Sequence, residues 1–423
     1  MTAAALSSPQ AGARTVTTAR IDDQNALLGL LPADGALSWV RRGEGLVGWG
    51  ETARLEVSGP TALADAAAWW EDHVAGLDVD DPLGVPGSGP VLFASVAFDP
   101  ARGTSVFVVP DVVVGRRDGI TWLTTAEAGP AAVPAQVRFE SGDGEGPRLR
   151  YADGALGPAG WCAAVASAVE RISAGELAKV VLARELLVSA EAPLDPRALL
   201  RRLAARFPDC WTFAVDGLLG ATPELLLRRT GRDLSARVLA GTAPRGAGAD
   251  DERLAAALLD SAKDRAEHAL AVESLVSALQ PYCTTLSAPA EPALLTLANV
   301  RHLATDVRGT QRRSGTRGRA GLLELVAAVH PTAAVCGTPT AEAAALIREL
   351  EGLDRGRYAG PVGWLDVRGD GEFGLALRCA ELSPDGTSAR LFAGCGIVAG
   401  SDPTTELAET QAKFAAFRAA LEG

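Results

Sequence analysis

The stretch GCGIVAGSDP, residues 394–403, combines a glycine-containing strand pattern with signals for the start of a helix. Residues 389–398 alternate in the manner of a β-strand, and this strand places Gly394 and Gly396 on the same face. A strand face without side chains lets a ligand approach the backbone closely. The Ser-Asp pair that follows can cap a helix, and the proline after it suits the first helical position. The sequence therefore predicts a strand that leads directly into a helix.

The predicted helix carries Glu406 and Glu409 three residues apart, so both carboxylates lie on one face, with Lys413 one turn further on. Two interpretations are open from this stretch alone. In the first, a bare backbone patch lies beside two carboxylates and an amine, as in a binding site. In the second, the glycines make a bend and the helix is solvated, with an ordinary i,i+4 Glu–Lys pair.

Composition restricts the class of protein. The 423 residues are 48% hydrophobic and 22% charged, which is typical of a globular protein with an ample core. A net charge of −12 and a pI near 5.0 argue against nucleic acid or an anionic membrane as the main partner. No apolar run reaches the roughly 18 residues of a membrane span. The six cysteines are scattered without a C-x-x-C pair, which indicates buried thiols in a reducing compartment, so a cytoplasmic location is expected.

The chain divides at its composition changes. Residues 1–20 are expected to be a disordered tail, because they lack an apolar core segment. Residues 21–150 have a mixed strand and turn pattern and are expected to complete the sheets of the molecule. The Gly/Pro/Asp-rich stretch around 141–160 predicts a loop, and the catalytic region is expected over residues 156–420.

Lysine is rare in this sequence and therefore informative. Of the 40 basic residues only three are lysines, Lys179, Lys263 and Lys413. A desolvated lysine can lose its proton, whereas an arginine in a protein cannot, so a retained lysine is a candidate base. Lys179 begins a predicted strand on its apolar face, where a lysine either extends to an edge or stays desolvated.

Other polar residues occupy unusual positions. Glu224 opens an apolar strand directly after a proline, and His302 alternates with apolar neighbours in a β-like run. Asp264 and Glu267 share a face of a predicted helix from Asp251 to about Gln280. Exposed charge on a long helix is the simpler interpretation of that pair. Together with Glu406 and Glu409, however, the two helices offer an all-oxygen ligand set of the kind that Mg²⁺ prefers.

A predicted strand at residues 373–381 has one apolar face and one face of small residues with a single arginine, Arg378. Small residues leave room beside the sheet, and a guanidinium in that room suits a carboxylate ligand.

Taken in order, these motifs resemble the chorismate-utilising enzymes, which include isochorismate, salicylate, anthranilate and aminodeoxychorismate synthases. The resemblance covers residues 161–419, and residues 39–51 (WVRRGEGLVGWGE) are similar to isochorismate synthases. The matching stretches are LAKVVLARE (177–185), GATPELLLRR (220–229), LAGT (239–242), KDRAEH (263–268), HPTAAVCGTP (330–339), YAGPVGW (358–364), FGLALR (373–378), GCGIVAGSDP (394–403) and ELAET with the lysine that follows it (406–413).

The resemblance implies an α+β fold of large layered antiparallel sheets flanked by helices, with the active site between the sheets, and a monomer. It implies Mg²⁺ as cofactor and chorismate as substrate. The implied metal ligands are Glu267 and Glu409 directly and Asp264 and Glu406 through water; the implied substrate-binding residues are Gly241, Thr242, His302, Thr338, Tyr358, Arg378, Gly394, Gly396 and Lys413; the implied catalytic residues are Lys179 as base and Glu224 as acid.

Within the family, the isochorismate synthase branch is expected, with salicylate synthase as the alternative. The anthranilate branch carries glutamine where this chain has Lys179, and the aminodeoxychorismate branch carries a nucleophilic lysine where this chain has LAGT (239–242). The implied reaction is water attack at C2 of chorismate with loss of the C4 hydroxyl, which feeds menaquinone or siderophore biosynthesis. A competing class is a nucleotide-binding protein, since Gly394, Gly396 and Gly400 are spaced like a dinucleotide loop, but too little chain follows to build a βαβ unit.

Overall fold

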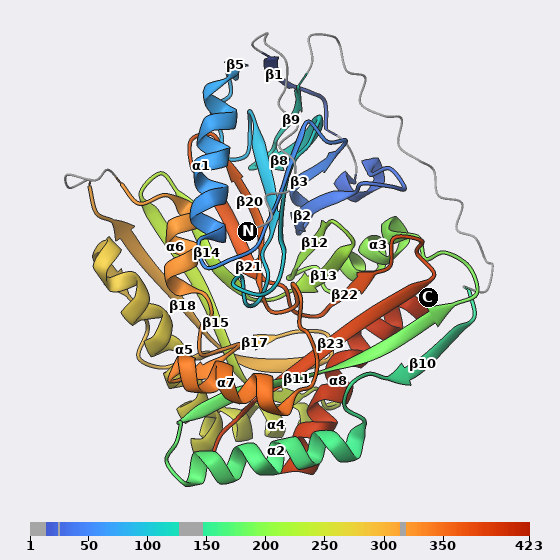
Figure 1. Cartoon of the computed structure of the whole chain (residues 1–423), viewed down its shortest axis with the longest axis vertical. Helices are drawn as coiled ribbons and strands as arrows, with labels where there is room; N and C mark the ends of the chain where they lie inside the picture. The colour runs from blue at the N-terminus through green and yellow to red at the C-terminus, as the bar shows by residue number, and fades with distance from the viewer. Residues whose placement is uncertain (1–13, 24–25, 127–146, 314–318) are drawn as a thin grey trace.

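The computed structural model of this protein describes residues 14–23, 26–126, 147–313 and 319–423. Two large β-sheets with helices around them make up the fold (Figure 1). The strand pairings are antiparallel, apart from β1 with β5, which run parallel. The predicted α+β class with large antiparallel sheets is confirmed.

The larger sheet has thirteen strands and draws on both halves of the chain. Its strands in spatial order are β10 (Leu149–Asp153), β11 (Lys179–Ala190), β23 (Ser388–Ile397), β22 (Cys379–Leu382), β13 (Leu218–Thr222), β12 (Trp211–Val215), β2 (Leu37–Arg41), β3 (Glu44–Trp49), β8 (Val112–Arg117), β9 (Ile120–Thr125), β1 (Arg14–Arg20) and β5 (Leu77–Asp80), with β19 (Gly337–Thr338) paired to β11.

The smaller sheet has ten strands. Their order is β16 (Cys283–Ser287), β18 (Val300–Gln311), β15 (Asp233–Pro244), β14 (Leu225–Thr230), β21 (Gly371–Leu375), β20 (Pro361–Asp366), β6 (Val91–Ser95), β7 (Ser105–Val109) and β4 (Ala53–Val57), with β17 (Ala293–Thr296) paired to β18.

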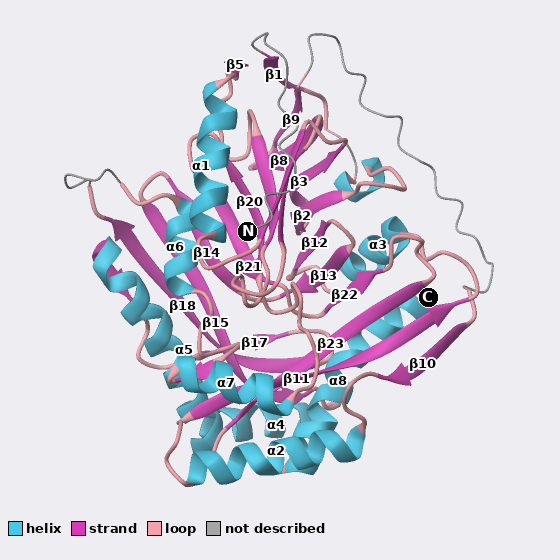
Figure 2. Ribbon diagram, in the orientation of Figure 1, coloured by secondary structure: helices cyan, strands magenta, loops and turns pink. Residues whose placement is uncertain are grey.

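Helices flank the two sheets (Figure 2). They are α1 (Ala62–Ala75), α2 (Pro158–Ser173), α3 (Pro196–Arg206), α4 (Ala249–Asp260), α5 (Ala262–Leu279), α6 (Leu322–Val329), α7 (Thr340–Leu350) and α8 (Pro403–Glu422), with the short 3₁₀ helices η1 (Leu27–Leu30) and η2 (Gln280–Tyr282). The helices α2, α7 and α8 pack around β11 and β23, whereas α5 packs on β15. Among the described residues, no helix is long and apolar enough to cross a membrane.

The core lies on both faces of the larger sheet because its strands alternate apolar residues. Trp39 and Phe213 point toward the smaller sheet and join one hydrophobic cluster with Phe373. Their chain neighbours Val40 and Ala214 point the other way and join a second cluster with α3, α8 and η1. A strand whose two faces are both covered in this way is held in one register, since a slip of one residue exchanges the faces.

Glu372 ties the two sheets together from inside the first cluster. This carboxylate on β21 is 4% exposed and accepts four hydrogen bonds, three of them from the larger sheet and one from Arg228 of β14. The donors are Trp39 Nε1 (3.0 Å), Trp211 Nε1 (3.1 Å), Arg117 Nη2 (2.9 Å) and Arg228 Nη2 (3.1 Å). Although burial alone would raise it, the arginine charges and these bonds lower the pKa of Glu372 to about 2.

Four local predictions differ from the structure. The stretch around 141–160 that was predicted as a loop contains β10 (Leu149–Asp153) and the first residues of α2, and residues 141–146 lie outside the described part of the chain. Within the expected disordered tail, Arg14–Arg20 form β1, which pairs with β9 and β5; residues 1–13 lie outside the described part of the chain. The single helix expected from Asp251 is two helices, because Ser261 ends α4 and caps α5, where its hydroxyl accepts a hydrogen bond from the Asp264 amide at 3.2 Å. This cap places Asp264 in the first turn of α5.

The predicted strand 373–381 is also wrong, because it breaks in the middle. The chain leaves the smaller sheet after Leu375 and enters the larger sheet at Cys379. Between them Arg378 has a φ of 50°, a left-handed conformation that no regular strand contains. Arg378 therefore does not share a strand face with its small neighbours; it lies at a crossing between the sheets.

Candidate active site

A cavity with about 710 Å³ of empty space lies where β11 and β23 of the larger sheet meet β15 and β18 of the smaller sheet. This cavity lies between the two sheets, where the sequence analysis expected the active site. Helices α5 and α8 contribute side chains to its wall. Eleven of the residues predicted from sequence line it: Glu224, Gly241, Thr242, Glu267, His302, Tyr358, Arg378, Gly394, Gly396, Glu409 and Lys413.

Four other predicted residues lie behind this lining. Lys179 is fully buried, and Thr338 pairs with it across β11 and β19. Glu406 is buried at the start of α8, and Asp264 is half-buried at the start of α5. The structure thus brings the whole predicted set into one region but does not expose all of it to the cavity.

Two chain crossings between the sheets lie side by side and form one wall. The chain passes from β13 to β14 through Pro223 and Glu224, and from β21 to β22 through residues 376–378. Backbone hydrogen bonds join the two crossings: the Leu375 amide donates to the Glu224 carbonyl at 3.3 Å, and the Ala221 amide to the Arg378 carbonyl at 3.2 Å. Glu224 and Arg378 therefore enter the cavity from irregular backbone that two sheets hold rigidly.

Glu224 is buried, with 4% of its surface exposed. Burial in this wall raises the pKa of Glu224 to about 8, and a hydrogen bond from the Leu239 backbone together with the charges of Lys179 and Lys413 opposes the rise only partly. A carboxyl with that pKa is mostly protonated at neutral pH, so Glu224 is suited to donate a proton.

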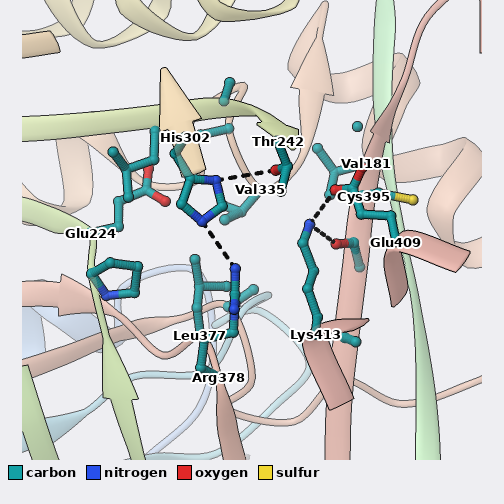
Figure 3. Close-up of a pocket in the computed structure, with 18 of the residues that line it drawn as sticks. Val181, Glu224, Thr242, His302, Val335, Leu377, Arg378, Cys395, Glu409 and Lys413 are labelled. Carbon is teal, nitrogen blue, oxygen red and sulfur yellow. Dashed lines mark hydrogen bonds and ion pairs between the residues drawn. The ribbon is translucent and has the colours of Figure 1, made fainter. Parts of the chain in front are cut away.

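His302 is fixed by two partners inside the cavity (Figure 3). Its Nε2 lies 3.0 Å from Arg378 Nη2, and its Nδ1 lies 3.1 Å from Thr242 Oγ1. A guanidinium can only donate, so Nε2 accepts and the proton of a neutral ring is on Nδ1, from where it is donated to Thr242. Burial, reinforced by the charges of Arg378 and Lys413, lowers the pKa of His302 well below its ordinary value, which keeps the ring neutral.

Lys413 lies to the right of His302 and Arg378 in Figure 3, next to Glu409. Its Nζ donates to the Gly394 carbonyl at 2.6 Å and forms an ion pair with Glu409 Oε1, also at 2.6 Å. The i,i+4 Glu–Lys pair that sequence suggested as an ordinary surface feature therefore exists, but it lines the cavity.

Gly396 has a steric reason to be glycine. A Cβ at this position would lie 2.1 Å from Glu267 Oε1 and 2.9 Å from Lys179 Cε. Lys179 itself forms an ion pair with Glu267, with Nζ 3.1 Å from Oε1. The sequence predicted that a ligand approaches the backbone closely at the glycines. At Gly396 the side chains of the Glu267–Lys179 pair make this close approach. At Gly394 a Cβ would meet the Leu182 carbonyl at 2.6 Å.

The four predicted metal carboxylates each have a partner on the protein. Glu267, Glu406 and Glu409 pair with Lys179, Lys263 and Lys413, respectively. Asp264 accepts a hydrogen bond from the Ser261 hydroxyl. Within the described ranges, no group of three His, Cys, Asp or Glu side chains is gathered as a metal site requires.

The donor set nevertheless fits a hard cation. All four groups are carboxylates from the facing ends of two helices, and Glu267 and Glu409 line the same cavity. The charge of Glu409 adds to burial in raising the pKa of Glu267, and Lys179 opposes this. Neighbouring carboxylates of this kind are the oxygen ligands that Mg²⁺ prefers, and they would hold an ion if their side chains turned from the lysines toward it.

Arg355 is a cavity residue that sequence analysis missed. It is buried, bonds the Glu351 carboxylate, and donates to the Val335 carbonyl at 2.9 Å and the Val181 carbonyl at 2.7 Å. The Glu351 carboxylate in turn accepts from the Ala183 amide at 2.7 Å. This pair fastens the strand of Lys179 to two loops of the wall. In sequence it resembles an ordinary i,i+4 pair after a surface helix, and the only signal was its position before the motif YAGPVGW.

The comparisons with known proteins agree with this geometry. A family model described as chorismate binding enzyme matches residues 36–422, and the chain belongs to this family of chorismate-binding enzymes. It is similar to a Mycobacterium tuberculosis protein provisionally named isochorismate synthase MenF, with 42% identity over 349 residues that cover 79% of this chain and 87% of the relative.

Isochorismate synthase MenF of Bacillus subtilis is 34% identical over 361 residues, which cover 79% of this chain and 75% of that protein. Among solved structures, MenF of Escherichia coli, the menaquinone-specific isochorismate synthase, matches with a TM-score of 0.79 and 26% identity. That match covers 98% of this chain and 96% of the other.

Proposed function

We propose that this protein is an isochorismate synthase that converts chorismate to isochorismate with Mg²⁺. Two groups beside one cavity carry the proposal: Glu224 in its wall, a carboxyl with a pKa of about 8, and Lys179, a buried lysine directly behind its lining. Attack at one ring carbon and departure from another need a proton donor and a proton acceptor at the same time. The isochorismate synthase names of the relatives support the same reaction.

The reaction exchanges one hydroxyl for another. A water molecule forms a bond to C2 of the ring and gives a proton to Lys179, the base, whose nitrogen accepts it once Lys179 no longer pairs with Glu267. The ring double bonds shift, the C4–O bond breaks, and the leaving hydroxyl takes a proton from Glu224 and departs as water. One water enters and one leaves, so substrate and product are isomers, and the two residues recover their protonation states by exchange with solvent.

The substrate carries two carboxylates, and the cavity offers cations for them. Among the described residues, no carboxylate lies within ion-pair distance of Arg378; its recorded partner is the neutral His302. Its guanidinium is therefore available for the enolpyruvyl carboxylate, with Tyr358 and the backbone near Gly394 alongside. Lys413 lies near the position proposed for the ring carboxylate.

Magnesium belongs to the proposal through its donor set. Glu267 and Glu409 would hold the ion directly, with Asp264 and Glu406 behind them through water. When bound, Mg²⁺ neutralises the ring carboxylate and orients the ring. The protein's own contribution is the rigid wall of two crossings, which keeps Glu224 and Arg378 at fixed positions beside the ring.

Product analysis tests the proposal. Purified protein with chorismate and Mg²⁺ is expected to give isochorismate, approaching an equilibrium mixture, with no pyruvate above the uncatalysed level. Salicylate and pyruvate in equal amounts would make the protein a salicylate synthase instead. Turnover in excess EDTA at the rate seen with Mg²⁺ would remove the metal from the proposal. Lys179→Ala is expected to lose turnover while it still binds chorismate.

A further inference from the structure

Lys263 has no place in the reaction described above, yet it makes one of the closest ion pairs in the region. Its Nζ lies 2.6 Å from Glu406 Oε1 and joins the first turn of α5 to the first turn of α8. The Glu406 side chain is 1% exposed, whereas the Lys263 side chain is 32% exposed. Lys263 does not line the cavity. The pair therefore lies on the solvent side of the carboxylate cluster.

The charges of the cluster explain why this position matters. Every lysine of the chain holds one of the candidate metal carboxylates: Lys179 holds Glu267, Lys413 holds Glu409, and Lys263 holds Glu406. With Asp264, four carboxylates face three ammonium groups, which leaves one net negative charge in the cluster. Lys179 and Lys413 have roles beside the ring. Lys263 contributes charge alone.

We propose that Lys263 is a built-in competitor of the metal ion, which neutralises Glu406 in the metal-free protein and lowers the affinity of the empty site for Mg²⁺. This inference rests on the proposed magnesium site. Two cations that both interact with the carboxylate cluster repel each other, and by linkage each weakens the binding of the other. Removing the Lys263 charge therefore destabilises the metal-free protein and strengthens metal binding.

The positions of the charges show that Lys263 weakens metal binding, and Coulomb's law gives the size of this effect on the affinity. A unit charge and a divalent ion about 10 Å apart in a water-like dielectric repel each other enough for about a fourfold change in affinity. A partly buried pair such as Lys263 and Glu406 is screened less than that, so fourfold is the lower end of the expected effect.

The charge of Lys263 also makes metal binding and substrate binding depend on each other. The net charge of the cluster is too small to hold a divalent ion tightly by itself. The ring carboxylate of the substrate adds negative charge beside the ion, so each ligand improves the site for the other. Without Lys263 the metal would bind well on its own, and the gain from substrate would shrink.

The test is a titration of the full-length protein with Mn²⁺ as the probe metal, without substrate, in which free Mn²⁺ is measured by electron paramagnetic resonance. Lys263→Met is expected to bind Mn²⁺ at least fourfold more tightly than the wild type. Lys263→Arg, which keeps the charge, is expected to bind no more tightly than the wild type. The matched control is Arg265→Met, which removes one charge two residues away on the same helix.

Arg265 suits this control because it is exposed and pairs with Glu291 at 2.7 Å, away from the cluster. Its loss is expected to change the Mn²⁺ affinity less than twofold. A Lys263→Met protein that binds Mn²⁺ no more tightly than Arg265→Met would overturn the inference while leaving the magnesium site intact. If neither the wild type nor Lys263→Met binds Mn²⁺, both the inference and the magnesium site are overturned.

Thermal unfolding gives a second readout that does not depend on activity. Lys263→Met is expected to have a lower Tm than the wild type without metal and a larger rise in Tm on addition of Mg²⁺. If the methionine variant does not fold, Lys263→Gln removes the charge while keeping a donor for Glu406, and the same larger rise is expected. An equal or smaller rise contradicts the competitor role.

Discussion

Replacing Glu224 by glutamine separates the chemical role of this residue from its effect on stability. Glutamine has nearly the same shape and can still accept the hydrogen bond from the Leu239 backbone, but it has no proton to give. Loss of a general acid costs about 10² to 10⁴ in kcat. We therefore expect Glu224→Gln to bind chorismate and to turn it over at least about a hundredfold more slowly than the wild type.

Stability is expected to move in the opposite direction. Burial raises the pKa of Glu224 from 4.5 in the unfolded chain to about 8, so the folded protein holds a proton that the unfolded chain releases between these values. The wild type therefore loses stability as the pH rises through this window. The full difference of 3.5 pKa units corresponds to about 5 kcal/mol, nearly all of it present by pH 9. The glutamine variant is free of this loss.

Denaturant unfolding of both proteins at pH 5, 7 and 9 measures the effect. The advantage of Glu224→Gln over the wild type should grow from about 1 kcal/mol at pH 5 to between 4 and 5 kcal/mol at pH 9. The kcat of the wild type should fall about tenfold per pH unit above 8. Glu342→Gln, on the exposed face of α7, is the matched control and should change neither property. A stability difference that does not vary with pH would refute the assignment of Glu224 as a buried acid.

Three further variants test other parts of the structure. Arg378→Gln removes the guanidinium that is proposed to bind a substrate carboxylate. Since breaking a buried charged contact costs at least about 2 kcal/mol, KM should rise about 30-fold or more. An unchanged KM would exclude this role of Arg378. Glu372→Gln should lower stability by about 3 kcal/mol at neutral pH, because a pKa of about 2 against 4.5 stabilises the fold above pH 4.5; denaturant unfolding should show the difference vanish near pH 2, and a constant difference would contradict it. Gly396→Ala would place a Cβ 2.1 Å from the Glu267 carboxylate and should lower kcat at least about a hundredfold. Gly400→Ala, with open space around it, should be active. Equal rates of the two variants would show that the cavity wall can shift to accommodate the added methyl group.

The sequence predicted correctly those elements whose structure depends on neighbouring residues of the same segment. The stretch 394–403 forms the end of β23 and the start of α8, as its alternation and turn residues predict. Asp402 is the N-cap and accepts from the Thr405 amide at 2.8 Å, with Pro403 in the first helical position. Each of these features depends on contacts within a few residues, which is why sequence contains them.

The crossings between the sheets could not be predicted in this way. The alternation of residues 373–381 continues through Arg378 as if one strand ran on, and no local signal marks the break. Tertiary contacts decide where this strand breaks. The two ends of the segment pair with different sheets, and the side chain of Arg378 bonds His302, 76 positions away. The same holds for the Lys263–Glu406 pair, whose partners are 143 positions apart. The carboxylate pairs were visible in the sequence, but of their counter-ions only Lys413, four residues after Glu409, was visible as well.

The carboxylates that form ion pairs in the core and around the cavity include two groups with different counter-ions. Glu351 and Glu372, which hold loops and sheets together, are bonded by arginines. Glu267, Glu406 and Glu409, which surround the cavity, are bonded by lysines, although arginine outnumbers lysine in the chain 37 to three. A planar guanidinium binds a carboxylate through two parallel bonds and keeps it, whereas an ammonium is a single flexible point charge that can exchange its partner and, when desolvated, its proton. If Mg²⁺ binds as proposed, the carboxylates that turn toward it are held by the residue that releases them more easily. In a chain so biased toward arginine, each of the three lysines thus stands beside a carboxylate that the proposed magnesium site requires to change its partner.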